Sequence, residues 1–189
     1  MAVCSRCLKR LIFWIILTII SIGAGLLIDL IVIKTNSFPN YIRIIGFTGI
    51  VFTHFLLKRT GKLLRFFGEC ELCGWSTSLI VINVYKCVRH PHHLGVGLFM
   101  TFLGLLIGLP ITCIILVFTQ WLWIFLFVIF IEEKECLEKF GNEYMEYKRN
   151  VPMFFGNPFC IIREIVKPLK KKCNRLYKNS LKNAHVDRG

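Results

Sequence analysis

Residues 94–131 read LGVGLFMTFLGLLIGLPITCIILVFTQWLWIFLFVIFI, a run without a single charged residue. A polar block, RHPHHLG at residues 89–95, leads into the run, and Glu132-Glu133 follows it directly. The run is too long for one crossing of about 20 residues, and Gly-Leu-Pro at 108–110 is suited to a tight turn near its middle. We therefore expect a helical hairpin that brings both polar blocks to the same membrane surface.

Composition places the whole chain in a membrane. The sequence has 189 residues, of which 55% are hydrophobic, and its mean hydropathy is +0.61. These values exclude an ordinary soluble domain and predict an all-α integral membrane fold. About four transmembrane helices are expected, followed by short cytoplasmic C-terminal helices. The expected spans are residues 11–33, 41–57, 94–109 and 111–131.

The chain divides into three parts by its apolar runs. Residues 1–74 are expected to form a two-span hairpin with a cytoplasmic loop. Residues 75–160 contain the second hairpin and both polar blocks, and residues 161–189 form a basic tail. Asp29 and His54 lie inside the first two spans, where ionisable residues are often functional, although both are also close enough to an interface to reach water.

Charge predicts the orientation. The formal net charge is +13, and Lys34 and Arg43 are the only basic residues expected outside, so both termini are predicted to be cytoplasmic. This places the protein in the endoplasmic reticulum if eukaryotic, or in the cell membrane if prokaryotic. The basic tail is expected to bind anionic lipid at about 1 kcal/mol per base. Nucleic acid is not an expected partner, because the tail has no interleaved aromatic residues.

Two cysteine pairs have the spacing of zinc ligands, namely Cys4 with Cys7 and Cys70 with Cys73. Two such pairs can close a tetrahedral zinc site, but nothing local fixes one pair against the other. The alternative is reduced thiols at the interface, two of them positioned for lipidation. No other metal site is expected, since the chain has 5 histidines, too few for a membrane di-iron centre.

The first polar block has the features of a helix start that binds an anion. Pro91 suits the first helical position, which makes His90 the residue at the cap. The free backbone N–H groups of the first turn can then hold a carboxylate or phosphate, next to the charge of Arg89. The same residues would also serve as an interfacial anchor.

The second block predicts a helix that leaves the membrane. Glu132 and Glu133 follow the last span, and Gly141 is expected to stop the helix as a left-handed cap. A short helix with Tyr144 and Tyr147 should follow and end at Val151-Pro152. Carboxylates at this depth need water or a partner, and a cation such as a sulfonium would serve; a solvated charged helix is the alternative.

Together the two blocks resemble the isoprenylcysteine carboxyl methyltransferase and phospholipid methyltransferase group of membrane enzymes. The resemblance covers about residues 85–152, a little over a third of the chain. The matching residues, in order, are Tyr85, Arg89, His90, Pro91, Gly95, Glu132, Glu133, Leu137, Phe140, Gly141, Glu143, Tyr144, Tyr147, Val151 and Pro152.

This resemblance implies an S-adenosylmethionine-dependent methyltransferase whose acceptor is lipid-soluble or prenylated. The cofactor would lie at the cytoplasmic surface between the His-Pro helix start and the Glu-Glu pair, and no residue is assigned as catalytic. The cofactor-binding residues it implies are Arg89, His90, Pro91, His93, Gly95, Glu132, Glu133, Tyr144 and Tyr147.

Three departures from the family pattern leave the acceptor open. His93 stands where a tyrosine is expected, and Asn83-Val84 stands where a glycine usually precedes the position of Tyr85. The carboxyl methyltransferases carry an arginine about one turn before Glu-Glu, where this chain has Phe-Val-Ile at 127–129. The methylated atom is therefore left open.

Two other readings remain. NADPH-dependent sterol and steroid reductases of membranes share Arg-His-Pro before a hairpin, but their second block usually begins Arg-Asp-Glu, where residues 130–133 read FIEE. A degenerate family member that acts as a membrane scaffold is the second alternative. Its packing face would be Gly104 to Gly108, although close packing within the hairpin explains these glycines equally well.

Overall fold

The structure is a computed structural model that describes residues 5–34, 36–67 and 79–167. Every regular element in these residues is helical, so the expected all-α fold is confirmed. The elements are α1 (Ser5–Leu27), η1 (Ile28–Val32), α2 (Asn40–Phe67), η2 (Asn83–Lys86), α3 (Pro91–Ile107), α4 (Pro110–Phe127), η3 (Val128–Glu132), α5 (Glu133–Asn150) and α6 (Pro158–Val166).

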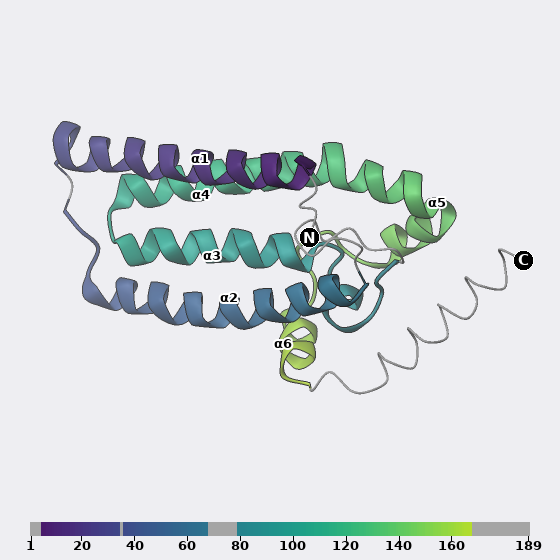
Figure 1. The fold of residues 1–189 in the computed structure, drawn as a ribbon. Coiled ribbons are helices and arrows are strands. Elements are labelled where there is room, and N and C mark those ends of the chain that lie inside the picture. The colour runs from purple at the N-terminus through teal and green to yellow at the C-terminus, as the bar shows by residue number, and fades with distance from the viewer. Residues whose placement is uncertain (1–4, 35, 68–78, 168–189) are drawn as a thin grey trace, which may run out of the picture.

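Helices α1 to α4 run alongside one another as an elongated bundle (Figure 1). Helix α1 packs against α4, α4 against α3, and α3 against α2. Helix α5 continues from α4 through the π-helical turn η3 and extends past one end of the bundle, where α6 also lies, near α2 and η2 (Figure 1). The polar blocks therefore lie at one end, and the α3–α4 turn lies at the other.

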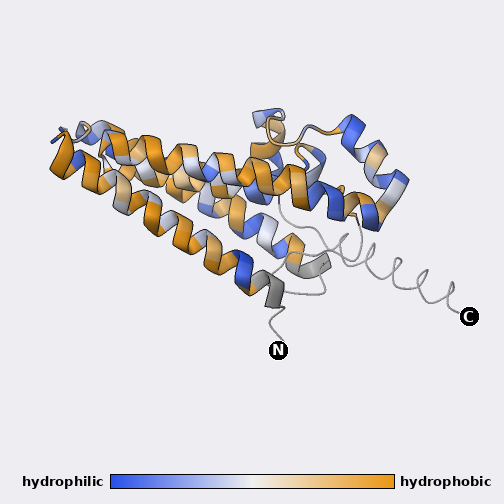
Figure 2. Ribbon diagram, turned by 90° about the horizontal axis from the view of Figure 1, so that it is seen from above, coloured by the Kyte–Doolittle hydropathy of each residue, from blue (hydrophilic) through white to orange (hydrophobic). Residues whose placement is uncertain are grey.

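Three helical stretches are long and apolar enough to cross a membrane: Leu8–Val32, Asn40–Leu64 and Pro110–Asn150. Helix α3 is shorter, as expected, with 17 residues. Within the first stretch, only 11% of the most apolar segment is buried inside the protein. Most of its side chains therefore face outward, where they can contact lipid. Hydrophobic residues cover the bundle in Figure 2, and hydrophilic residues gather toward the end that carries α5.

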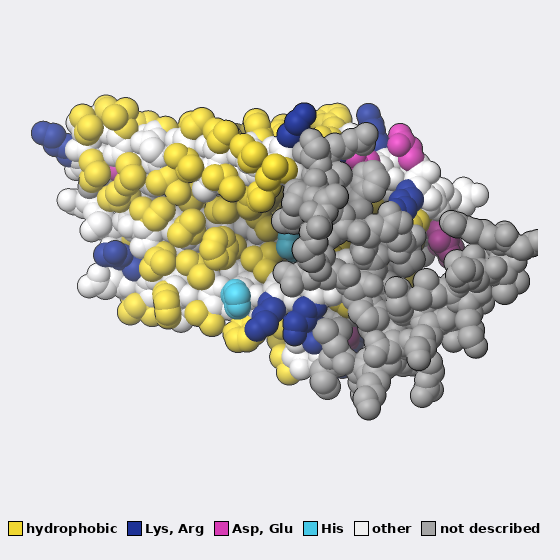
Figure 3. All heavy atoms as spheres, in the orientation of Figure 1, with side chains coloured by type: hydrophobic (Ala, Val, Ile, Leu, Met, Phe, Trp, Pro, Cys, Tyr) yellow, Lys and Arg dark blue, Asp and Glu magenta, His cyan; other side chains and the backbone are white. Residues whose placement is uncertain are grey.

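A band of hydrophobic side chains covers the face of the bundle seen in Figure 3. Lysine and arginine side chains lie toward the two ends of this band (Figure 3). Such a distribution fits a body surrounded by hydrocarbon with its charges near the interfaces.

The predicted turn between α3 and α4 is present. Gly108 ends α3 in the left-handed conformation, with φ of 81°, and its N–H donates to Gly104 O at 3.3 Å. Pro110 is the first residue of α4. A Cβ on Gly104 would lie 3.0 Å from Cys113 Sγ, so this glycine lets the two arms of the hairpin approach. The glycines of this segment thus serve packing within the hairpin.

Glycine also sets the close approach of α2 to α3. A Cβ on Gly46 would lie 2.6 Å from the backbone nitrogen of Leu106, a separation that side chains do not tolerate. Since the neighbouring atom is backbone, it cannot move aside as a flexible side chain would. Helix α2 is therefore held firmly along α3, which carries the histidines of the first polar block.

Asp29, one of the two ionisable residues expected inside the spans, has a structural partner. Its buried carboxylate accepts hydrogen bonds from Thr112 N at 2.6 Å, Thr112 Oγ1 at 2.7 Å and Ile111 N at 3.2 Å. It thereby satisfies N–H groups of the first turn of α4, which have no partner within the helix. His54 is exposed on α2, beside the ring of Phe55.

Candidate functional site

The two polar blocks meet in space, as the hairpin predicts. Arg89 N donates to Pro152 O at 2.9 Å, and His90 N donates to Met153 O at 3.2 Å. These backbone hydrogen bonds join the segment before α3 to the segment after α5. The first block is thus attached to the second independently of any side chain.

The start of α3 has the predicted form. Pro91 is the first helical residue, and His90 occupies the cap with φ of −117° while its carbonyl accepts from Leu94 N at 3.0 Å. The proline needs no hydrogen bond from its own nitrogen, which is why the helix begins here. The backbone N–H groups of the first turn point away from the membrane-spanning part of α3.

Glu132 and Glu133 lie where one helix becomes another. Helix α4 ends at Phe127, and the π-helical turn η3 separates it from α5, which starts at Glu133. A π-turn adds backbone to each turn of helix, so it changes the face on which later residues lie. Because successive residues of a helix point in different directions, the two neighbouring carboxylates have different partners.

Glu133 is buried between two cationic side chains. Its Oε1 lies 3.0 Å from Arg89 Nη2, and its Oε2 forms an ion pair with Lys148 Nζ. Arg89 Nη1 also donates to the carbonyl oxygen of Lys148 at 3.2 Å. These contacts connect the loop before α3 to both halves of α5.

Helix α5 folds back to bring Lys148 to Glu133. The pair is separated by 15 positions, which a straight helix would place roughly 22 Å apart. The bend occurs at Gly141, whose φ of 51° and ψ of −125° are non-helical. The sequence correctly marked Gly141 as a break, but its conformation is not the expected left-handed cap. The second half of α5 ends at Asn150, and Val151 is extended.

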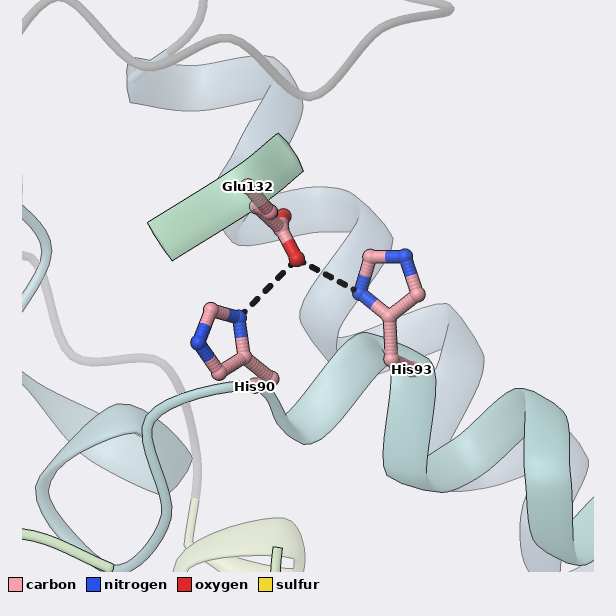
Figure 4. Close-up of side chains that lie close together, drawn as sticks. All are labelled: His90, His93 and Glu132. Carbon is pink, nitrogen blue, oxygen red and sulfur yellow. Dashed lines mark ion pairs between the residues drawn. The ribbon is translucent and has the colours of Figure 1, made fainter. Parts of the chain in front are cut away.

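Glu132 faces two histidines rather than lysine or arginine. Its Oε2 lies 3.0 Å from His90 Nδ1 and 3.1 Å from His93 Nδ1 (Figure 4). Burial lowers the pKa of His90, but the nearby carboxylates of Glu132 and Glu133 outweigh burial and raise it to about 9. His90 is therefore a cation at neutral pH when nothing else is bound.

The two predicted tyrosines are both buried, but their hydroxyl groups differ. Tyr147 OH donates to the carbonyl oxygen of Tyr85 at 2.5 Å, so it fixes α5 against η2. Tyr144 is 2% exposed, and its hydroxyl has no hydrogen-bond partner among the described residues. Of the two tyrosines, Tyr144 is therefore the one whose hydroxyl can bind another molecule.

Several other buried polar atoms of the site also make no hydrogen bond of good geometry with the described residues, although the two carboxylate oxygens among them lie in ion pairs. Native proteins rarely leave such atoms unsatisfied, so each one indicates water, an ion or a ligand. Their concentration at the junction of the two blocks makes this place the candidate binding site. Together with Tyr144 OH, these atoms are Arg89 Nε, His90 Nε2, Glu132 Oε2 and Glu133 Oε1.

Gly95, another residue that the resemblance implies, faces α2. A Cβ on Gly95 would lie 3.0 Å from Leu57 Cδ2, so this glycine admits α2 against α3. Of the cysteines considered as zinc ligands, Cys4, Cys70 and Cys73 lie outside the described residues, as does the side chain of Cys7.

Sequence analysis did not single out three features of the site. Lys148 reaches Glu133 only through the bend at Gly141. Phe154 is 2% exposed, and its ring centroid lies 6.1 Å from that of His90. A disulfide joins Cys87, two residues before Arg89, to Cys160 of α6, 73 positions away. Lys148 is the one feature with a usable sequence signal, because positions 144, 147 and 148 share one face of a helix.

A comparison with known proteins agrees in part with the resemblance. The chain is 37% identical over 81 residues to the protein-S-isoprenylcysteine O-methyltransferase of Saccharomyces cerevisiae (strain ATCC 204508 / S288c). That similarity covers 43% of this chain and 33% of the yeast protein, so the chain spans about a third of the length of this relative. No family model matches the chain, and no solved structure matches it.

Proposed function

We propose that this protein is an integral membrane methyltransferase that uses S-adenosylmethionine to methylate a lipid-soluble or lipidated acceptor. The observation that carries the proposal is the junction of the two polar blocks, where Glu133 is held by Arg89 and Lys148 beside unsatisfied buried polar atoms. The partial similarity to a yeast methyltransferase of prenylated cysteine supports the same reading.

The unsatisfied atoms fit the polar groups of S-adenosylmethionine. Glu133 Oε1 can accept a hydrogen bond from an ammonium or a ribose hydroxyl, and Tyr144 OH can donate to or accept from a ligand. Arg89 Nε is a buried donor that can face a carboxylate. A ligand with several donors and acceptors would satisfy all three.

The residues at this end have separate roles in the proposed site. The first turn of α3 offers backbone N–H groups to the carboxylate, while Glu133 balances positive charge. When bound, S-adenosylmethionine supplies a methyl group on a positively charged sulfur. The protein contributes alignment and exclusion of water, and no side chain is assigned as an acid, base or nucleophile.

A shallow, open apolar hollow on one face of α4 is the surface along which a lipid-soluble acceptor would approach. It has a volume of about 630 Å³ and lies along α4, ending at Leu126, less than two turns before Glu132. A hydrocarbon chain lying in this hollow would have its polar end close to the candidate site. The lining residues are Cys113, Ile114, Val117, Phe118, Trp121, Leu122, Phe125 and Leu126.

We place this end of the bundle at the cytoplasmic surface, where S-adenosylmethionine is available. The proposal rests on the basic residues near the site, such as Arg10, Lys58 and Lys62, against Lys34 and Arg43 at the other end. The basic tail, proposed to bind anionic lipid, lies outside the described residues beyond Lys167.

Binding of S-adenosylmethionine to the detergent-purified protein, measured by calorimetry, tests the proposal. Tyr144→Phe removes only the unsatisfied hydroxyl, and Glu133→Gln removes the buried charge. We expect each to weaken binding by about 10- to 100-fold, and Glu143→Gln, on the exposed face of α5, to leave it unchanged.

Each alternative predicts a different result in the same experiment. Saturable binding of NADPH in place of S-adenosylmethionine would overturn methyl transfer in favour of the reductase reading. If neither S-adenosylmethionine nor NADPH binds, the protein is better explained as a membrane scaffold without enzymatic activity. Equal affinity in wild type, Tyr144→Phe and Glu133→Gln would show that the cofactor binds elsewhere.

A further inference from the structure

The arrangement around Glu132 differs from that around Glu133 in one respect. Glu133 has two permanently charged partners, Arg89 and Lys148. Among the described residues, the ion-pair partners of Glu132 are His90 and His93 alone. Within the described part of the chain, the carboxylate of Glu132 thus pairs with side chains that are themselves able to bind a metal ion.

The three side chains converge on one point. His90 Nδ1, His93 Nδ1 and a carboxylate oxygen of Glu132 all lie within 4.8 Å of one another. Both imidazole rings turn a nitrogen toward the same oxygen, one from the cap of α3 and the other from its first turn (Figure 4). This oxygen is buried, yet it makes no hydrogen bond in proper geometry with any described residue.

These separations are close to those of ligands on one metal ion. Nitrogen and oxygen ligands bound to zinc at about 2.0–2.2 Å in a tetrahedron stand roughly 3.3 Å apart. The observed separations between Oε2 of Glu132 and the nitrogens of His90 and His93 are 3.0 and 3.1 Å. Only a small outward movement of the carboxylate is needed to admit an ion.

A second carboxylate stands behind one of the histidines. His90 Nε2 lies 3.6 Å from Glu133 Oε1, slightly beyond hydrogen-bond distance, and the same oxygen is paired with Arg89 Nη2 at 3.0 Å. Metal-binding histidines usually donate their other N–H to a carboxylate, and a small movement of His90 would let its Nε2–H donate to Glu133. The ring of His93 is in turn packed against Phe127, with centroids 5.5 Å apart.

We propose that His90, His93 and Glu132 bind a divalent transition metal ion of the zinc type. Two imidazole nitrogens and one carboxylate oxygen suit zinc and its neighbours, whereas magnesium and calcium prefer oxygen alone. Histidine binds metals in its neutral form, so binding of the ion requires both imidazole rings to be unprotonated at the metal-facing nitrogen.

The test is binding of Co²⁺, whose visible absorption reports its coordination, to the purified full chain without S-adenosylmethionine. We expect a spectrum of nitrogen and oxygen coordination that Zn²⁺ abolishes. Loss of a residue that only supports a metal ligand typically weakens binding by about 10- to 100-fold. His93→Ala removes a ligand itself, so it should weaken Co²⁺ binding by more than that. His92→Ala is the matched control, since His92 Nδ1 instead faces Thr60 Oγ1 at 3.2 Å.

A second variant and a second measurement guard against loss of folding. His93→Tyr keeps an aromatic ring but removes the nitrogen, so it should also lose Co²⁺. Zn²⁺ should raise the thermal unfolding temperature of wild type and His92→Ala, but not that of either His93 variant. Equal Co²⁺ binding in wild type and the His93 variants, a spectrum dominated by thiolate charge transfer, or no binding would each overturn the proposal.

The outcome is separable from that of the methyltransferase proposal. Co²⁺ binding is measured without cofactor, and S-adenosylmethionine binding is measured in a chelating buffer. Failure of one therefore leaves the other standing.

Discussion

Arg89 and Glu133 form an ion pair of 3.0 Å in which the two side chains are only 7% and 8% exposed. The pair joins the segment before α3 to the start of α5, two elements that lie on either side of the hairpin. Because both charges are taken from water, neither can lose its partner without a large cost. This pair therefore holds together the two halves of the candidate site.

Arg89→Ala is expected to lower the free energy of unfolding by about 3–5 kcal/mol, since it leaves Glu133 charged and buried with fewer partners. Thermal or denaturant unfolding in detergent measures this change. Arg149→Ala, at an exposed position of α5, removes the same charge from the surface and should have little effect. Similar stabilities for the two variants would contradict the assigned role of Arg89.

Tyr147 and Tyr144 offer a comparison in which a single oxygen atom is removed from each. Tyr147→Phe loses the hydrogen bond to Tyr85 O and should destabilise the protein by about 1–3 kcal/mol. Tyr144→Phe removes a buried hydroxyl with no partner among the described residues, so its stability should stay the same or rise. Unfolding curves of the two variants decide this, and the reverse order would refute the assignment.

Asp29 is expected to stabilise the end of the bundle opposite the candidate site. Asp29→Ala leaves Thr112 N and Ile111 N without an acceptor at the start of α4. Loss of a charged hydrogen-bond partner typically costs about 1.5–3 kcal/mol, so the unfolding temperature should fall clearly. Binding of S-adenosylmethionine at low temperature should be retained. A variant as stable as wild type would show that Asp29 is not a cap.

The sequence predicted the hairpin and the meeting of the two blocks because both follow from local rules. An uncharged run of residues 94–131 must stay in the membrane, and Gly108 with Pro110 permits only one place for the turn. Pro91 likewise has few positions open to it other than a helix start. The site then forms wherever the two ends of the hairpin come together.

The partners within the site could not be predicted, because they depend on backbone irregularities far from the residues concerned. The contact between Lys148 and Glu133 depends on the φ and ψ of Gly141, midway between them. The pairing of His90 and His93 with Glu132 depends on the direction in which the π-helical turn η3 points the Glu132 side chain. Neither the bend at Gly141 nor the π-turn can be predicted from residue spacing alone, since a straight helix would be equally consistent with the sequence pattern.

Docking of α6 should depend on pH through Glu164. Lys86 Nζ at 2.8 Å and Lys167 Nζ at 2.9 Å hold the pKa of this buried carboxyl below its usual value. A lowered pKa in the folded state means that the contribution to stability is present above the unfolded pKa of about 4.5 and is lost as the pH falls through the folded value.

Glu164→Gln should therefore remove part of the acid sensitivity of unfolding. The difference in unfolding temperature between wild type and this variant should shrink as the pH falls below about 4.5. Glu143→Gln serves as the control, because Glu143 is exposed on α5. A difference that stays constant with pH would show that the ion pairs of Glu164 do not stabilise α6.

The bond between Cys87 and Cys160 tests the proposed orientation. The two sulfurs lie at the same end of the bundle as the candidate site, where we place the cytoplasm, and the cytoplasm keeps thiols reduced. The test is to quench intact cells with acid, denature the protein and alkylate its free thiols. We expect both Cys87 and Cys160 to carry the alkyl label. Protein purified without reductant should instead yield the disulfide-linked peptide, and Cys160→Ser should not. A linked peptide from acid-trapped cells would place this end in an oxidising compartment and reverse the orientation.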